Sequence, residues 1–263
     1  MESKTQILKR FNVSYLGSTT SSQKVVKSAK NGVLTYILYL APSTMASDAT
    51  HKINVCPVSH TCREQCLSGS GHSLIEARAG KSVIQQARIR KTQAFYDCRE
   101  DFMRVLIAEI KHYKNIARKK RMRFAVRLNG TSDLSPLVFK SQGKSILQLF
   151  PRTQFYDYTK VPARTKIKAK NYDLTFSYSG DNWDTCEEFL MDNGRVAVVF
   201  DMPLPLTYRG YRVIDGDTTD ARFLDEQGVV VGLKYKHNKS DYKSGSYSRI
   251  KNTFVVDEEN YIP

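Results

Sequence analysis

Residues 56–66 read CPVSHTCREQC and bring three of the chain's five cysteines together in a C-x5-C-x3-C spacing. The stretch before them, residues 32–42 (GVLTYILYLAP), is β-branched and aromatic and ends in proline, which predicts a buried strand. Residues 73–116 behind the cysteines carry apolar side chains at helical spacing and predict two helices. We therefore expect the cysteine loop to follow the first core strand of an α/β barrel and to lie at its mouth.

The rest of the chain repeats this order of strand and crossover. Short apolar runs, each with a polar tail, occur at residues 124–128, 153–158, 173–178, 195–200, 212–214 and 229–235. Strands that alternate with helical or looped connections indicate a mostly parallel sheet. Their number and the short late connections favour a partial or distorted (β/α) barrel rather than eight regular units.

Length and composition limit the number of domains and the kinds of segment that we expect in this chain. With 263 residues and 41% apolar residues, the chain is long enough for one barrel-like domain, which we place at residues 31–263. Residues 1–30 are polar and basic, and we expect them to form an arm or an edge hairpin. The longest apolar run, residues 36–42, is far shorter than the roughly 20 residues of a membrane span, so we expect a soluble protein of the cytoplasm.

The clustered thiols predict a metal site. Cytoplasmic cysteines stay reduced, and thiolates are soft ligands that suit zinc or iron–sulfur clusters, so Cys56, Cys62 and Cys66 are the expected ligands. Three protein ligands leave a fourth position open, as in catalytic sites. The candidates for that position are His60, His72, Cys98 and a small molecule. The isolated Cys98 and Cys186 are otherwise interpreted as small buried apolar residues.

Acidic residues gather in the predicted strand tails. Asp133, Asp157 and Asp217 share this position, and parallel strands present their carboxyl ends at one edge. They are candidate catalytic residues, and carboxylates so placed also suit Mg²⁺ and phosphoryl chemistry. The alternative for each single aspartate is turn formation.

The formal net charge of +15 makes a polyanion the natural partner, although a solubility charge explains it as well. The residues that we interpret as a nucleic-acid-binding surface are Arg88, Arg90, Lys91, Arg118, Lys119 and Lys120.

The order of strand, cysteine loop, long helix and strand resembles that of radical S-adenosylmethionine enzymes. The resemblance implies a [4Fe–4S] cluster on the three cysteines and S-adenosylmethionine as a ligand, with residues 129–133 (NGTSD) in the place of the cofactor-binding segment after the second strand. The family's usual spacing is C-x3-C-x2-C, from which this chain departs.

Several segments together are similar to the bacteriophage gene product 88 family. They include CPVSHTCREQCLSGSG, ARIRKTQAFYDCREDF, VRLNGTSDLS, NYDLTFSYSG and VIDGDTTDARFLD, in that order. The resemblance implies a phage-encoded protein of the host cytoplasm, without an assigned activity. It marks as motif positions Arg127, Asn129, Asp133, Tyr156, Asp157, Lys160, Ser177, Ser179, Asp215, Asp217 and Lys234.

Three functional hypotheses follow. The first is an iron–sulfur enzyme of the radical type that modifies a nucleotide or nucleic acid. In it the substrate or cofactor would meet Arg127, Asn129, Gly130, Ser177, Ser179 and Lys234. The second is a zinc-stabilised basic protein that binds nucleic acid or a host factor without catalysis. The third is a Mg²⁺-dependent nuclease that uses the strand-end aspartates.

Overall fold

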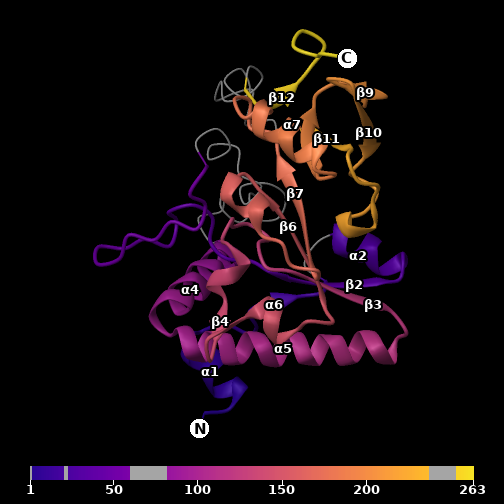
Figure 1. The fold of residues 1–263 in the computed structure, drawn as a ribbon. Helices are drawn as coiled ribbons and strands as arrows, with labels where there is room; N and C mark the ends of the chain where they lie inside the picture. Colours follow the sequence, from indigo (N-terminus) through magenta and orange to yellow (C-terminus); the bar gives the residue numbers. More distant parts are fainter. Residues whose placement is uncertain (1, 21–22, 60–81, 237–252) are drawn as a thin grey trace. The chain divides into compact units, whose positions relative to one another are not determined.

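A computed structural model describes residues 2–20, 23–59, 82–236 and 253–263 (Figure 1). The chain divides into two compact units, and each is described by itself. Unit 1 comprises Met1–Pro57, Cys66–Asp157 and Ala169–Tyr172. Unit 2 comprises Val58–Gln65, Tyr158–Lys168 and Asp173–Pro263. Both units combine helices with a mostly parallel sheet, which confirms the mixed α/β class.

Unit 1 contains the N-terminal half of the fold. Its helices are α1 (Lys4–Arg10), α2 (Gln23–Lys30), α4 (Val83–Asp97), α5 (Arg99–Lys119), the 3₁₀ turn η2 (Pro136–Val138) and α6 (Ile146–Leu149). Its strands are β1 (Gly17–Ser18), β2 (Val33–Leu38), β3 (Arg123–Arg127), β4 (Lys140–Ser141), β5 (Lys144–Ser145) and the first four residues of β6 (Gln154–Thr159).

The sheet of unit 1 has the order β1-β2-β3-β6. Strands β2, β3 and β6 are parallel, and Val33 stands opposite Arg123. Strand β1 pairs antiparallel to β2 at the edge. All six residues of β2 are buried, as a central parallel strand with both faces covered requires.

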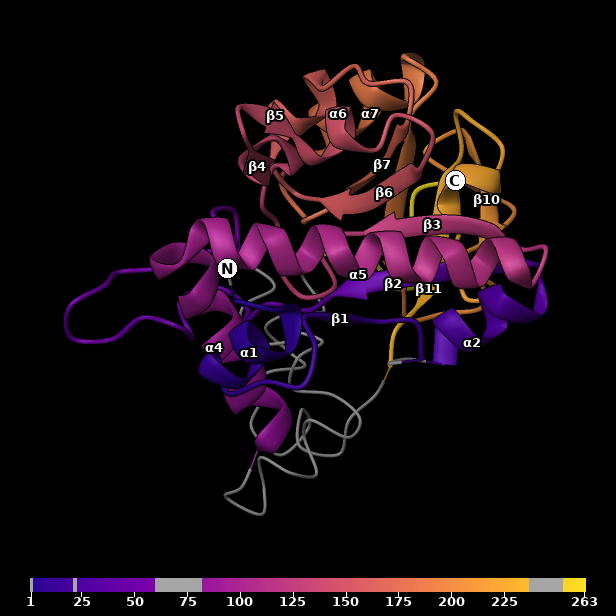
Figure 2. The same cartoon turned by 90° about the horizontal axis from the view of Figure 1, so that it is seen from below.

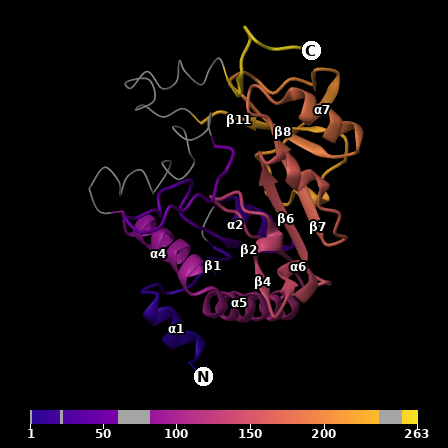
Figure 3. The same cartoon turned by 60° about the vertical axis from the view of Figure 1, so that its left-hand side comes forward.

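Helix α5 packs on this sheet through an apolar stripe. Phe102, Leu106 and Ile110 follow one another at four-residue intervals, and none of the three is exposed to solvent. The chain bends between α4 and α5 at Cys98, whose extended φ of −130° interrupts the helical path (Figure 3). The two predicted helices are therefore present, and residues 73–81 of that prediction lie outside the described residues.

Unit 2 contains the C-terminal half of the fold. Its helices are the 3₁₀ turn η3 (Pro162–Lys166), α7 (Trp183–Met191) and the 3₁₀ turn η4 (Arg222–Leu224). Its strands are the last five residues of β7 (Tyr172–Ser177), β8 (Arg195–Phe200), β9 (Thr207–Tyr208), β10 (Tyr211–Asp215), β11 (Val230–Lys234) and β12 (Val255–Val256).

The sheet of unit 2 has the order β7-β8-β11-β10-β9. Strands β7, β8, β11 and β10 are parallel, and β12 pairs parallel to β8 beyond the end of β7. Strand β9 runs antiparallel to β10 and forms a hairpin with it. A buried cluster that includes Phe176, Cys186, Val198 and Phe200 fills the space between this sheet and α7.

The predicted strands are present within a few residues of their expected bounds. Residues 137–149, expected as a helical or looped connection, contain the end of η2, the β4–β5 hairpin and the short α6. Gln142 and Gly143 adopt positive φ between β4 and β5, which matches a tight hairpin turn. Residues 1–30, expected as an arm or hairpin, hold α1, β1 and α2.

The described strands do not show a closed barrel, and the partial barrel stays a prediction. In the described parts of the chain, no helix combines the length and apolarity that crossing a bilayer requires.

Candidate functional site

The candidate site of unit 1 lies at the carboxyl ends of β2 and β3, where the two loops that follow these strands are hydrogen-bonded to each other. The Gly130 N–H donates to the Leu38 carbonyl at 2.9 Å, and the Thr131 hydroxyl donates to the Leu40 carbonyl at 2.6 Å. Further along, the Asp133 N–H donates to the Val55 carbonyl at 2.8 Å. These bonds place Cys56 beside the loop after β3.

Cys56 is the described member of the cysteine cluster. Its Sγ accepts the Ser43 N–H at 3.3 Å and lies 3.9 Å from the Thr131 carbonyl oxygen. Ser43 adopts a φ of 51°, a left-handed conformation that is uncommon for a residue other than glycine. The thiol is half-buried and packs against a small apolar cluster that includes Ala41 and Val55. The sulfur is thus held in place by its own loop.

Asn129 organises the loop after β3. Its side-chain amide donates to Asp157 Oδ2 and to the Leu134 carbonyl, each at 2.9 Å. Its Oδ1 accepts the Ser132 hydroxyl and the Leu134 N–H, also at 2.9 Å. Asn129 is 2% exposed, so these bonds satisfy a polar side chain that burial would otherwise penalise.

Asp157 completes this network from the neighbouring strand β6. Its Oδ1 accepts the Asn129 N–H at 2.9 Å, while its Oδ2 accepts the Asn129 side chain, and the residue is 1% exposed. The carboxylate therefore fixes the loop. Its bonds with Asn129 are those of a positioning residue, and it lies within β6 rather than in a polar tail after the strand.

Gly130 has a packing role in the same loop. A Cβ at this position would lie 2.6 Å from Tyr39 Cδ1 and 2.8 Å from Ile37 Cγ2. Glycine is therefore required for the close approach of the β2 and β3 ends. Arg127, another predicted ligand-binding residue, donates from Nε to the Asn129 carbonyl at 3.2 Å.

The predicted site residues of unit 2 form two separate groups. Asp217 Oδ2 accepts the Lys234 N–H at 2.9 Å, which joins the loop after β10 to the end of β11. Ser179 donates its N–H to Asn182 Oδ1 at 2.7 Å, and the Asn182 amide donates to the Ser177 carbonyl at 3.1 Å. The second group forms the turn into α7.

The cysteine ligands other than Cys56 cannot be placed in this geometry. Cys62, Cys66 and the candidate ligands His60 and His72 lie outside the described residues. Within the described ranges there is no group of three His, Cys, Asp or Glu side chains suited to a metal ion. Cys186 is fully buried in unit 2, and burial raises the pKa of its thiol to about 12, which suits the expected apolar role.

The predicted nucleic-acid-binding cations separate into two classes. On α4, Arg88 lies over the Tyr39 ring at 5.2 Å, and Arg90 donates from Nε to the Asn12 carbonyl at 2.9 Å. Lys91 is 6% exposed, with its Nζ 4.5 Å from the centre of the Tyr15 ring. These three side chains contact unit 1 itself. At the end of α5, by contrast, Arg118, Lys119 and Lys120 are exposed.

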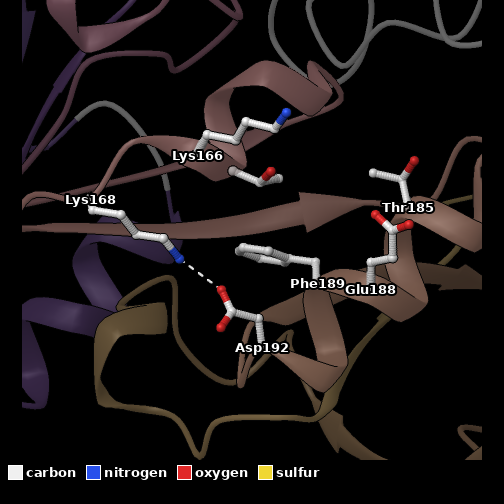
Figure 4. Close-up of a pocket in the computed structure, with 7 residues that line it drawn as sticks. Lys166, Lys168, Thr185, Glu188, Phe189 and Asp192 are labelled. Carbon is white, nitrogen blue, oxygen red and sulfur yellow. Dashed lines mark hydrogen bonds and ion pairs between the residues drawn. The ribbon is translucent and has the colours of Figure 1, made fainter.

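A shallow pocket of about 290 Å³ lies in unit 2 between η3 and α7 (Figure 4). Its lining includes Lys166, Glu188 and Phe189, and none of the sequence-predicted site residues. The Lys168 ammonium is 2.7 Å from Asp192 Oδ2 across its rim, and both side chains are largely exposed. Because the charges at the rim compensate each other in contact with water, we assign no function to this pocket.

Sequence reasoning did not identify the residues that hold the Cys56 loop. Ser43, Thr92 and Thr131 act through backbone bonds: Thr92 Oγ1, for example, accepts the Ala41 N–H at 2.8 Å. Ser132 and Leu134 likewise donate hydrogen bonds to Asn129 Oδ1. Hydroxyl residues of this kind carry no spacing signal, since their partners are distant in sequence.

Comparison with known proteins gives one match. A family model described as gene product 88 matches residues 7–255, which is most of the chain. No curated protein and no solved structure matches the chain.

Proposed function

The chain belongs to the gene product 88 family, and from this premise we propose that it is a phage-encoded iron–sulfur protein that acts on a nucleotide or nucleic acid. Cys56, Cys62 and Cys66 would hold the cluster at the carboxyl edge of the parallel strands of unit 1. The observation that carries the proposal is the environment of Cys56 Sγ, which accepts the Ser43 N–H at 3.3 Å.

An N–H···S bond of this kind suits a cysteine ligand. Hydrogen bonds to cysteine sulfur stabilise thiolate charge and are one of the ways in which proteins tune iron–sulfur centres. The strained φ of 51° at Ser43 aims this N–H, and strain of this type gathers at functional sites. The remaining two thiols enter the proposal through their sequence spacing alone.

We propose different roles for the residues around Cys56. Asn129 and Asp157 position the loop after β3, so that Asp157 supports the site without reacting. Asp133, which follows in this loop and is half-buried, is the proposed acid or base. Arg127 and Gly130 complete the proposed cofactor contacts.

A bound cluster would supply one-electron chemistry at this edge. S-adenosylmethionine as the ligand of its open iron, and a barrel that encloses it, stay predictions. The chain's own contribution is a fixed sulfur and a loop held rigid by buried hydrogen bonds.

The test is metal analysis of protein purified without oxygen. We expect about four irons and four sulfides per chain, with broad visible absorption. Cys56→Ser, Cys62→Ser and Cys66→Ser should each lose most of the iron. Cys186→Ala is the control, because Cys186 is a free thiol buried in the apolar cluster of unit 2 and is not a candidate ligand; it should retain the full content.

Two results would contradict the proposal. One zinc per chain, lost in Cys56→Ser, would indicate a structural site and the non-catalytic alternative. Protein without any metal would refute the ligand assignment and direct attention to Asp133 and Asp217 as nuclease residues.

A further inference from the structure

A second surface lies at the opposite end of the strands of unit 1, where β2 and β3 begin. Helix α2 precedes β2 and helix α5 precedes the adjacent parallel strand β3, so both helices end at this edge. The Arg123 N–H donates to the Gly32 carbonyl at 2.9 Å, which joins the two helix-to-strand turns directly. Figures 1 and 2 both show α2 and the C-terminal end of α5 together at this end of the strands.

Exposed cations gather on these two turns. We call them the amino-edge patch, and its members are Lys27, Lys30, Arg118, Lys119, Lys120, Arg121 and Arg123. The sequence has no Asp or Glu at residues 3–47 or 111–132, so neither segment supplies a neutralising carboxylate. Arg118, Lys119, Lys120 and Arg121 form no ion pair within the described part of the chain.

Arg121 occupies a turn whose backbone conformation does not require an arginine side chain. Helix α5 ends with the Met122 N–H on the Ala117 carbonyl at 2.9 Å and the Arg121 N–H on the Arg118 carbonyl at 3.1 Å. This is a Schellman motif, and it puts Arg121 at a φ of 54°. After helix α2 the residue with positive φ is Gly32, at a φ of 77°. Arginine is thus present where backbone geometry favours glycine.

The helix dipole explains only part of the patch. Cations in the last turn of a helix offset the partial negative charge of its end, which gives Arg118 and Lys119 of α5 a structural role. That effect fades within the last turn, whereas Arg121 and Arg123 follow the helix. Cations from two chain segments therefore converge beyond what either helix end requires.

We propose that the amino-edge patch binds the phosphate backbone of nucleic acid. Guanidinium groups match phosphate oxygens in two-point hydrogen bonds, and lysines add sequence-independent attraction. A membrane surface would favour large apolar side chains among the cations. Among the described residues 23–33 and 111–123, which hold α2, the end of α5 and the two turns, Val26 is the single exposed large hydrophobic side chain. The patch therefore fits nucleic acid better than lipid.

This inference rests on the proposed function in one respect: it takes the cysteines as the site of the reaction. The patch lies at the amino ends of β2 and β3, whereas Cys56 lies beyond the carboxyl end of β2. Nucleic acid on the patch would be anchored away from the thiols, and the patch would set affinity without taking part in the reaction.

The test is fluorescence anisotropy of labelled duplex and single-stranded DNA with the full chain over a series of salt concentrations. The patch variant is Arg118→Gln, Lys120→Gln and Arg121→Gln combined. The charge-matched control is Lys140→Gln, Lys144→Gln and Arg152→Gln, which neutralises three exposed cations elsewhere in unit 1. In the patch variant the slope of log Kd against log salt should fall by about two to three, with at least about tenfold weaker binding near 0.1 M salt. The control should keep a slope within about one of the wild type.

Arg121→Gly provides a second variant that separates binding from folding. It removes one cation and relieves the left-handed backbone, so we expect weaker binding with an unchanged or higher unfolding temperature. Equal losses in the patch and control variants, or wild-type binding by the patch variant, would overturn the proposal. Binding to vesicles of anionic lipid but not to DNA would overturn it in favour of a membrane surface.

The outcome is independent of the metal test. Cys56→Ser should bind DNA with the wild-type salt slope, and the patch variant should keep its metal content. DNA binding by a metal-free wild-type protein would leave the patch intact and remove the proposed function alone.

Discussion

Lys91 and Glu109 show how single residues of unit 1 adapt to burial. Glu109 is 2% exposed, and its carboxylate accepts the N–H groups of Leu16 and Gly17 and, at 2.7 Å, the Tyr36 hydroxyl. These bonds hold β1 against β2. Burial lowers the pKa of Lys91 from 10.5 to about 8, with Arg88 adding to the decrease and Glu109 opposing it. A cation expected on the surface is thus an internal group.

The Lys91 pKa has a consequence for stability. The unfolded chain keeps the Lys91 proton up to about pH 10.5 and the folded chain only up to about pH 8, so the unfolding free energy should rise between these values. The Lys91→Met variant lacks this titrating group. We therefore expect the unfolding free energy of the wild type minus that of Lys91→Met to become more positive across this window. Chemical denaturation at intervals from pH 7 to pH 10 measures it. A flat difference would show that Lys91 keeps its usual pKa.

The Asn129 network predicts a graded pair of variants. Asn129→Ala removes the side-chain donor to the buried Asp157 carboxylate and the side-chain bonds with Ser132 and Leu134, so it should lower the unfolding free energy by about 2–4 kcal/mol. Ser132→Ala removes one hydrogen bond from the same loop and should cost only about 1 kcal/mol. Urea denaturation gives both values. Equal costs would mean that Asn129 does not organise the loop.

At the level of elements, helix ends decide how the chain enters the sheet of unit 1. Helices α2 and α5 both turn into parallel strands through a residue with positive φ, Gly32 in one and Arg121 in the other. The site at the opposite edge depends on equally close contacts, since Gly130 admits no Cβ beside Tyr39. Turn conformation therefore fixes both edges of the strands.

Arg121→Gly tests the cost of the second turn. Glycine adopts the left-handed region without a Cβ penalty, so the variant should raise the unfolding free energy by about 0.5–1 kcal/mol. Thermal and urea denaturation give the value. Lys120→Gly is the matched control, because Lys120 has a helical φ of −84° and glycine there should destabilise. A decrease in both variants would contradict the assigned role of the turn.

For the molecule as a whole, one chain folds into two compact units. In unit 2, Arg195 at the start of β8 donates to Asp173 at 2.8 Å and to the carbonyls of Glu226 and Asp225. Arg195 is 4% exposed, and burial raises the pKa values of Asp173 and Asp225 despite this cation. The arginine thus ties the starts of β7 and β8 to the loop before β11.

Removing Arg195 should destabilise unit 2 in particular. Arg195→Leu leaves buried acidic and carbonyl groups without their donor, at an expected cost of about 3–5 kcal/mol. Amide hydrogen exchange should show the largest loss of protection in β7, β8 and β11, with smaller changes in β2 and β3. The control, Arg212→Leu, breaks an exposed ion pair with Glu226 and should cost less than about 1 kcal/mol. Uniform loss across both units would show that they open together.

The sequence by itself determined the class of the fold and the places where polar residues gather. Runs such as residues 195–200 indicated buried parallel strands, because apolar periodicity depends on neighbours along the chain. Tertiary structure decided what the polar residues do. Asp157 became a support for Asn129 and Lys91 an internal cation, while Arg121 lies in an exposed turn beside Arg123. Burial and partners come from segments distant in sequence, and local pattern carries no information about them.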